Sequence, residues 1–367
     1  MALVAAISAV VYVISTTSCQ KISTRAKQLL CIPLFALTLL LPLCVASPLF
    51  VLTILGELHL FNIALRFSEV IYVQSLVYGK PAEISSAALS TEFASVMRLK
   101  SRDTSKAKQV PWYRLLVPIS VNVLLTNVVA SWYTTFEGPE VLEIPHNSFI
   151  YFVFFFFAVV IMSSVINAIG YIGQIIHVIL NEGGKFVQDE WRPLMDMPII
   201  ASSLGELWGR RWHQMFKNIW LAIPFRPVKT LCKPVMGTTA ANTFATISVF
   251  FVSGLMHEYL IICEAGTQAY FKRFVGQECL FFTIHGVAVL FERWFQQRFQ
   301  IPSNLATRIL GHVWMVGFAF LTFPWFLNSF AYFGVWHANP FHTFVPYLID
   351  NVWRKYSILR PFCGNLL

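Results

Sequence analysis

Long apolar stretches, separated by shorter polar and basic segments, set the pattern of this chain. About 20 consecutive apolar residues cross a bilayer as a helix, and these stretches lack the alternation typical of barrel strands. The pattern therefore predicts an all-α, polytopic membrane protein with about eight transmembrane helices. We place these spans near Ala2–Thr17, Leu29–Val45, Pro48–Leu65, Leu115–Trp132, Phe149–Leu180, Ala240–Cys263, Leu280–Phe291 and Leu310–Phe330.

The first span, the fifth span and the segment after the eighth span each show a feature that bears on how they cross the membrane. The first span has no preceding basic region and no clear cleavage site of small residues, so we expect it to be retained. Phe149–Leu180 is too long for one perpendicular helix, so it is tilted, broken near Gly170 or Gly173, or continued into the cytosol. Ala331–Leu348 is apolar but interrupted by prolines and polar residues, and it could form a ninth membrane element.

The composition agrees with a membrane protein. Of the 367 residues, 56% are hydrophobic and 12% are charged, and the mean hydropathy is +0.62. Soluble domains carry about 25% charged residues, so this chain cannot cover its surface with polar groups. We find no internal repeat, low-complexity tract or separate soluble segment, and expect residues 1–367 to form a single integral membrane domain.

The basic residues orient the predicted spans. The net charge is +9, and the segments 66–114 and 181–239 carry eight Lys and Arg residues each, whereas Tyr133–Asn147 carries none. The positive-inside rule places both basic segments on the cytoplasmic side and both chain termini on the lumenal side. Anionic headgroups or phosphates explain these charges better than nucleic acid, which we do not expect as a partner.

The seven cysteines are scattered along the chain. They form no CxxC pair and no His/Cys spacing typical of a metal site. We therefore expect small core residues or unused thiols, and no bound metal.

The segment Phe250–Leu260 places a histidine and a carboxylate inside an apolar span. Ionisable groups at that depth cost roughly 2.5–3.5 kcal/mol, so they usually face the protein interior and have a function. Ser253 and His257 are four residues apart and share one helix face, and Gly254 allows close approach of a neighbour or ligand. Glu258 lies about 100° around the helix and should pair elsewhere. A neutral imidazole there suits a general base for an alcohol, although a structural histidine bonding a neighbouring helix is an equal alternative.

Other histidines are weaker candidates on the same reasoning: His285, His312 and His337.

A second candidate region lies in the basic segment at Ala201–Met215. Ser203 and Glu206 form an S-x-x-E capping box, which predicts the start of a helix. Tryptophans on one face and cations on the other are typical of a helix at the membrane surface, so this helix is either an anchor or a site for a phosphorylated ligand such as coenzyme A. One predicted face carries Leu204, Leu207, Trp208, Arg211, Trp212, Met215 and Ile219, and the other carries Arg210, His213 and Lys217.

The two regions together resemble a known family. The string SLGELWGRRWHQM is followed by Arg226-Pro227 and then by FFVSGLMHEYL. This order is similar to the membrane-bound O-acyltransferases, in particular the plant and fungal wax synthase-like branch, which shows S-L-x-D-F-W-G-R-R-W-[NH], then R-P, then S-G-x-x-H-[DE]. The resemblance is strongest over Glu190–Phe295.

Three positions depart from the branch pattern. Glu206 stands where an aspartate is usual, Leu207 where a phenylalanine is usual, and His213 where plant relatives have asparagine. Glutamate keeps the charge and the cap. Histidine donates a hydrogen bond as asparagine does, but its charge depends on pH.

The resemblance implies an acyl-CoA-dependent transfer onto a hydroxyl in the endoplasmic reticulum membrane, with acyl-CoA as co-substrate and no metal or other cofactor. We assign the base to His257, and an assisting role at the acyl carbonyl to His213 or a nearby donor. Arg210, Arg211 and Lys217 would face the CoA phosphates. The supporting residues would be Ser253, Glu258, Glu206, Trp208 and Trp212.

Several alternatives stay open. Among acceptors, a long-chain fatty alcohol, giving a wax ester, leads; acetyl transfer to a terpenoid, sterol or diacylglycerol hydroxyl is the next hypothesis. A membrane transporter is disfavoured because no repeated halves are visible, and a non-catalytic scaffold is hard to reconcile with His257. The acyl length and the oligomeric state do not follow from the sequence.

Overall fold

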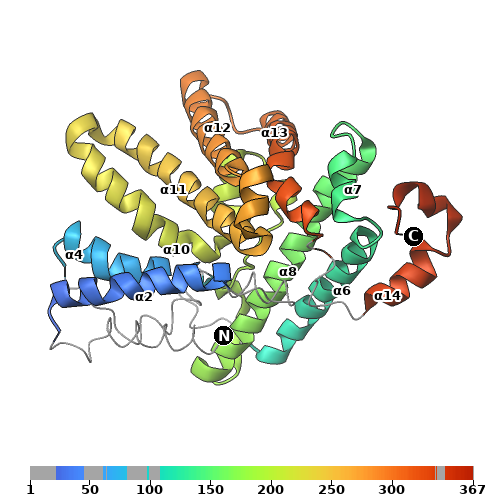
Figure 1. The fold of residues 1–367 in the computed structure, drawn as a ribbon, viewed down its shortest axis with the longest axis horizontal. Helices are drawn as coiled ribbons and strands as arrows, with labels where there is room; N and C mark the ends of the chain where they lie inside the picture. The colour runs from blue at the N-terminus through green and yellow to red at the C-terminus, as the bar shows by residue number, and fades with distance from the viewer. Residues whose placement is uncertain are drawn as a thin grey trace. The chain divides into compact units, whose positions relative to one another are not determined.

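A computed structural model describes residues 22–44, 61–62, 64–80, 97–98, 108–334, 336 and 344–366. These residues are mostly helical (Figure 1), and a single short antiparallel sheet pairs β1 (Gln109–Pro111) with β2 (Lys185–Val187) within the described ranges. The predicted all-α class is confirmed. Contacts group the chain into two compact units: unit 1 is Met1–Glu92 with Phe216–Phe291, and unit 2 is Phe93–Met215 with Glu292–Leu367. The expected single domain stays a prediction.

Four helices in the described part are long and apolar enough to cross a membrane, which identifies an integral membrane protein. They correspond to the fourth, fifth, sixth and eighth predicted spans: Trp112–Tyr133, Phe149–Asn181, Gln214–Arg273 and Leu305–Tyr332. Eight spans are therefore not confirmed.

The other predicted spans have mixed outcomes. Ala2–Thr17 and most of Pro48–Leu65 lie outside the described residues. The predicted second and seventh spans are helical, in α2 (Thr24–Cys44) and α12 (Gln277–Phe299), but neither belongs to the four membrane-length helices.

Unit 1 is built around α11 (Arg226–Arg273), which opens with the Arg226-Pro227 pair. Gly237 and Gly266 have φ angles of 77° and 72°, so they divide α11 into three stretches, and the middle one contains the predicted span Ala240–Cys263. The unit also contains α2, η2 (Glu69–Val73), α4 (Gln74–Leu76), α10 (Lys217–Trp220), η8 (Leu221–Phe225) and the first part of α12.

Unit 2 is built around α6 (Leu116–Tyr133) and α8 (Phe149–Asn181), which pack side by side (Figure 1). α8 is one continuous helix of 33 residues, about 50 Å long at 1.5 Å per residue. The suggested break near Gly170 or Gly173 is wrong, which leaves tilt or continuation beyond the apolar layer. Further elements are η3 (Trp112–Leu115), α7 (Gly138–Glu143), η4 (Gln188–Glu190), η5 (Pro198–Ile200), α9 (Leu204–Glu206), η6 (Leu207–Arg211), α13 (Leu305–Tyr332), α14 (Val345–Leu348), η11 (Ile349–Trp353) and η12 (Ser357–Phe362).

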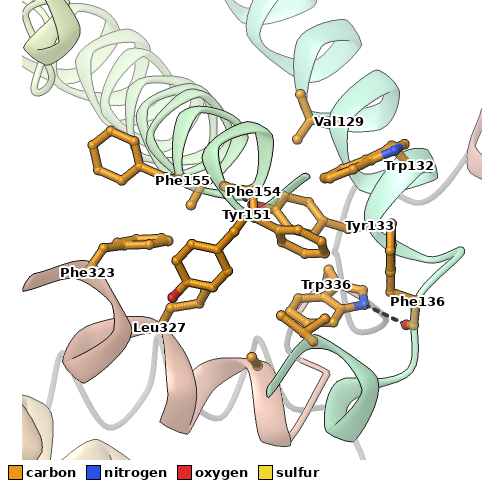
Figure 2. Close-up of a cluster of buried hydrophobic side chains, with 13 residues drawn as sticks. Val129, Trp132, Tyr133, Phe136, Tyr151, Phe154, Phe155, Phe323, Leu327 and Trp336 are labelled. Carbon is orange, nitrogen blue, oxygen red and sulfur yellow. Dashed lines mark hydrogen bonds between the residues drawn. The ribbon is translucent and has the colours of Figure 1, made fainter. Parts of the chain in front are cut away.

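Buried aromatic rings join α6, α8 and α13 in unit 2 (Figure 2). The Tyr133 and Trp336 rings stack with centroids 5.1 Å apart, and the Tyr133 hydroxyl donates to the Phe154 carbonyl at 2.6 Å. Figure 2 also shows the Trp336 indole donating to the Phe136 carbonyl. Each aromatic pair contributes about 0.5–1.5 kcal/mol beyond the area that it buries.

The last described residues pack back onto α6. The Trp353 indole donates to the Ser131 hydroxyl at 2.8 Å, and the Gly364 amide donates to the Thr135 hydroxyl at 3.0 Å. Within the described part of Ala331–Leu348, α14 has only four residues, so no membrane-length ninth helix is seen there.

Candidate active site

His257 lies in the middle stretch of α11 and is 8% exposed. Its Nδ1 atom is 2.8 Å from the Ser253 carbonyl oxygen, and its ring stacks on Phe282 with centroids 4.3 Å apart. A carbonyl only accepts hydrogen bonds, so Nδ1 carries the proton of the neutral ring and Nε2 carries the lone pair. The contact with Ser253 therefore fixes the tautomer in which Nε2 is the basic atom.

Glu258 is buried next to His257 but faces other partners. Its carboxylate accepts hydrogen bonds from the Tyr270 hydroxyl and from the Cys279 amide, the latter at 3.0 Å. A carboxylate at the N-terminal end of α12 is favoured by the amides exposed there. The expectation that Glu258 pairs away from His257 is confirmed, and its contacts fix α12 against α11.

Gly254 lies at the closest approach of these two helices. A Cβ atom at this position would be 2.7 Å from the Cys279 Cα atom, so no larger residue fits without moving α12. The close neighbour that the sequence predicts for Gly254 is thus α12. The His257 ring and its stacking partner Phe282 follow one turn later on the same two helices.

A helix begins after Ser203 as predicted, but only half of the capping box forms, because the Glu206 carboxylate accepts the Ser202 amide instead of the Ser203 amide. The Ser203 hydroxyl accepts the Glu206 amide at 2.9 Å, α9 follows, and η6 continues as a π-helical turn. The helix then ends, because the Trp212 backbone is extended (φ −76°, ψ 149°).

The predicted single amphipathic helix is therefore wrong beyond Arg211. The cause is tertiary: the Gln214 amide donates to the Leu194 carbonyl at 3.1 Å, and the Asp196 amide donates to the Arg211 carbonyl at 2.8 Å. These bonds draw the chain onto the 194–196 segment and outweigh local helix preference. Helical structure with Lys217 resumes separately in α10.

Glu206 and Arg211 form the central ion pair of this segment. Glu206 accepts the Ser202 amide and hydroxyl, both at 2.8 Å, and the Arg211 Nε at 2.7 Å. Burial alone would raise the pKa of Glu206, but the hydrogen bonds from Ser202 and Arg211 outweigh burial and lower this pKa to about 2. Arg211 also donates to the Asp196 carbonyl at 2.9 Å. Glutamate is longer than the aspartate usual in the branch pattern, and Glu206 nevertheless pairs with Arg211.

The three predicted phosphate-facing cations differ in exposure. The Arg211 side chain is 11% exposed and is turned toward Glu206, whereas the Arg210 side chain is 69% exposed, with Nε 3.8 Å from an Asp196 carboxylate oxygen. Lys217 is also exposed. Arg210 and Lys217 therefore face the surroundings, and Arg211 does not.

The remaining predicted residues of the segment lie together in unit 2. The Trp208 and Trp212 rings have centroids 5.5 Å apart, and the His213 ring is 5.9 Å from that of Trp212. The structure thus groups Glu206, Trp208, Arg210, Arg211, Trp212 and His213 in unit 2, and Ser253, His257, Glu258 and Lys217 in unit 1.

Two further residues hold the start of the segment, and sequence reasoning missed the first. Glu292 of α12 accepts the Leu204 amide at 3.1 Å and the Gly205 amide at 2.9 Å, which are among the unpaired N–H groups of a helix start. His312 Nδ1 lies 2.9 Å from the Ala201 carbonyl. The only sequence signal for Glu292 is a carboxylate at the end of an apolar stretch, and it does not name a partner.

The other histidine candidates lie in unit 1 or outside the described residues. His285 is fully buried against Phe281, with ring centroids 4.4 Å apart. His337 lies outside the described residues. Across the part of the chain that the structure describes, no group of three or more His, Cys, Asp and Glu side chains is arranged to hold a metal ion.

Comparison with known proteins shows that the same two regions are similar to one family. Residues 191–284 match the model described as "Membrane bound O-acyl transferase family". The chain is 30% identical over 179 residues to "Probable long-chain-alcohol O-fatty-acyltransferase 9" of Arabidopsis thaliana, covering 45% of this chain and 47% of the relative. It is also 30% identical over 129 residues to "Probable long-chain-alcohol O-fatty-acyltransferase 2" of Arabidopsis thaliana. This match covers 33% of this chain and 35% of the relative.

A third relative, "Probable long-chain-alcohol O-fatty-acyltransferase 8" of Arabidopsis thaliana, is 38% identical over 66 residues, covering 18% of this chain and 20% of the relative. The chain thus spans less than half the length of these relatives. The predicted resemblance to the membrane-bound O-acyltransferases and their wax synthase-like branch is confirmed, and the family match contains both His257 and the 206–213 segment.

Proposed function

We propose that this protein is an acyl-CoA-dependent O-acyltransferase that esterifies a long-chain fatty alcohol to give a wax ester. The observation that carries the proposal is His257, a buried imidazole in a membrane-length helix whose tautomer is set by the Ser253 carbonyl. The family match over residues 191–284 and the printed names of the relatives support the same reaction class.

In the proposed reaction, His257 Nε2 accepts the proton of the alcohol hydroxyl while the hydroxyl oxygen attacks the thioester carbonyl carbon. The tetrahedral intermediate collapses, the carbon–sulfur bond breaks, and the CoA thiolate takes the proton from the imidazolium. The products are an ester and CoA, and His257 returns to its neutral form. A general base of this kind contributes about 10²–10⁴-fold to the rate.

The intermediate carries a negative oxygen, which needs a hydrogen-bond donor. We assign this role to His213, which replaces the asparagine of plant relatives and can donate in the same way. Trp208 and Trp212 support the position of this segment, and Glu258 supports His257 by fixing α12 against α11.

The CoA phosphates would be met by Arg210 and Lys217, the two exposed cations of the predicted set. We assign Arg211 a positioning role, because its guanidinium already pairs with Glu206 and with the Asp196 carbonyl. The transfer itself uses acyl-CoA as co-substrate and requires no metal or bound cofactor.

The acceptor would reach His257 through the bilayer. An alcohol dissolved in lipid meets a base inside a span without losing a hydration shell, whereas a sugar or a peptide side chain would first have to be desolvated. We also place the protein in the endoplasmic reticulum, which co-localisation of a tagged chain with a resident marker would test.

The deciding experiment incubates membranes of a host expressing the chain with labelled acyl-CoA and a panel of acceptors. The panel contains a fatty alcohol, diacylglycerol, a sterol and a terpenoid alcohol, with long-chain acyl-CoA and acetyl-CoA tested separately. We expect wax ester as the main product, and about 10²–10⁴-fold less from His257→Asn, which keeps a side-chain donor for the Ser253 carbonyl but has no basic nitrogen. Esterification of water-soluble acceptors alone would refute lateral entry, and preference for acetyl-CoA with a terpenoid alcohol would replace the proposed substrate pair.

A further inference from the structure

Unit 2 contains a cavity of about 350 Å³ whose walls include none of the candidate active-site residues described above. It lies where the start of α6, the last third of α8 and the stretch after β2 meet, and its volume falls near the lower end of the range for ligand pockets, about 300–1,000 Å³. Its walls include Arg114, Leu115, Tyr171, Gln174, Trp191 and Arg192.

Two side chains that line the cavity each carry a buried nitrogen with no hydrogen-bond partner among the described residues. These atoms are the amide nitrogen of Gln174, a residue 1% exposed, and the indole nitrogen of Trp191, a residue 9% exposed. Buried polar groups are nearly always paired in native proteins, by protein atoms, water or a ligand. Both atoms are donors, so the missing partner is a hydrogen-bond acceptor.

The charges in the walls point to the same kind of partner. Arg114 and Arg192 contribute two guanidinium groups, and burial lowers the pKa of Arg192, as expected for a cation away from bulk water. Among the described residues that line the cavity there is no Asp or Glu. Guanidinium and neutral N–H groups together match the oxygens of a phosphate, which has several acceptors and a negative charge.

The elements that form the cavity also carry lipid-facing residues. Tyr113 precedes Arg114 and Val117 precedes Pro118, and they are 56% and 65% exposed, whereas Ile172 and Ile176, on the face of α8 opposite Gln174, are 41% and 54% exposed. Apolar residues exposed on membrane-length helices face acyl chains. A phosphate in this cavity would therefore sit where a membrane amphiphile carries its head group, with its apolar part beside Leu115.

We infer that this cavity binds the phosphate ester of an amphiphile, either the head group of an anionic phospholipid or the phosphorylated end of acyl-CoA. The donors of Gln174 and Trp191 and the guanidinium groups of Arg114 and Arg192 hold the phosphate oxygens. Binding does not depend on the proposed acyl transfer, although occupation by CoA would deepen that proposal by locating part of its donor.

A ligand in the cavity would also stabilise the 206–213 segment, which carries the proposed oxyanion donor His213. Directly after Arg192 and Pro193, the Met195 backbone is held to α8 by Asn167 through bonds of 2.8 and 3.0 Å. Leu194 and Asp196 then bond to Gln214 and Arg211, as described above. Residues 192–196 thus form part of the cavity wall at one end and bond to the segment around Arg211 at the other.

The test measures binding directly on the full chain purified in detergent, in two arms. Native mass spectrometry follows bound phosphatidylglycerol, and equilibrium dialysis follows labelled CoA. We expect wild-type protein to bind at least one probe, and Gln174→Leu and Trp191→Phe each to weaken that binding about tenfold, in proportion to one lost hydrogen bond to a charged group. Lys185→Gln, which removes an exposed cation outside the cavity, should change binding less than about twofold.

The two arms identify the source of the phosphate. Weakening in the phosphatidylglycerol arm assigns a lipid, and weakening in the CoA arm assigns the acyl donor. His257→Ala should bind as wild type does, which separates this inference from the proposed catalysis. Trp191→Phe keeps a ring against His177 and removes only the N–H, so it remains informative if Gln174→Leu does not fold. Absence of binding to both probes, or unchanged binding in both folded variants, would overturn the inference.

Discussion

The His257 site and the Glu206–Arg211 segment hold their polar groups by opposite means. His257 and Glu258 are buried in or beside a span and contact a backbone carbonyl, a tyrosine hydroxyl and a backbone amide. Glu206 and Arg211 form an ion pair in a segment that is partly exposed. Charge is costly at membrane depth, so the proposed base is kept neutral, with its tautomer set by hydrogen bonding alone. Near water, an ion pair can set the shape of a segment instead.

Replacing the histidine should give the largest effect. His257→Ala removes the proposed base, so we expect turnover to fall about 10²–10⁴-fold while membrane insertion is retained. Turnover of labelled acyl-CoA is compared at equal protein level, with His257→Asn as the matched variant that keeps the Ser253 contact. A mutant with half of the wild-type turnover would remove His257 from the chemistry.

Breaking the ion pair should instead lower stability. Arg211→Gln leaves Glu206 without its charged donor, and we expect a loss of about 1.5–3 kcal/mol in the free energy of unfolding, with a smaller loss for Arg211→Lys, which keeps the charge. Denaturant unfolding of purified protein measures this. If Arg211→Gln raised only the KM for acyl-CoA and left unfolding unchanged, the guanidinium would be a ligand contact and our positioning role would fail.

Removing the exposed cations should have a smaller and different effect. Arg210→Gln and Lys217→Gln should each raise the apparent KM for acyl-CoA about 2–5-fold, the size expected of exposed charge pairs, with kcat unchanged. Added salt should reproduce part of this increase in the wild type and less of it in the variants. A change confined to the KM for the alcohol would show that these cations serve the acceptor.

The last prediction concerns pH. The pKa of Glu206 is lowered to about 2 in the folded protein, from an unfolded value of about 4.3. Its stabilising contribution is therefore complete above pH of about 4.3 and is lost as the pH falls toward 2. The melting temperature of the wild type should drop more steeply over this window than that of Glu206→Gln. Parallel curves would mean that Ser202 and Arg211 do not stabilise the ionised carboxylate.

The sequence predicts well what depends on composition and on helical spacing. The length of the apolar stretches located the four observed membrane-length helices, and the four-residue spacing correctly placed Ser253 and His257 on one face. The predicted Ser203 cap also marked the start of α9. These features are local, so neighbouring residues are sufficient to define them.

What the sequence did not predict depends on distant contacts. The end of the helix at Trp212 and the inward turn of Arg211 are set by backbone bonds to residues 194–196. The cap supplied by Glu292 lies 88 residues beyond Leu204. Neither pattern nor propensity identifies such partners, because each is chosen by the packing of the folded unit.

The bonds between the end of the chain and α6 have a consequence for biosynthesis. The Gly364 amide meets the Thr135 hydroxyl across a separation of 229 residues. At translation rates of about 5–20 residues per second, α6 waits about 10–45 s in the membrane before these partners emerge. During that interval the Trp132 indole lacks the Phe362 carbonyl to which it donates, and the Ser131 hydroxyl lacks the Trp353 indole from which it accepts. We therefore expect a ribosome-stalled chain that ends before residue 344 to be more sensitive to protease around α6 than the released protein.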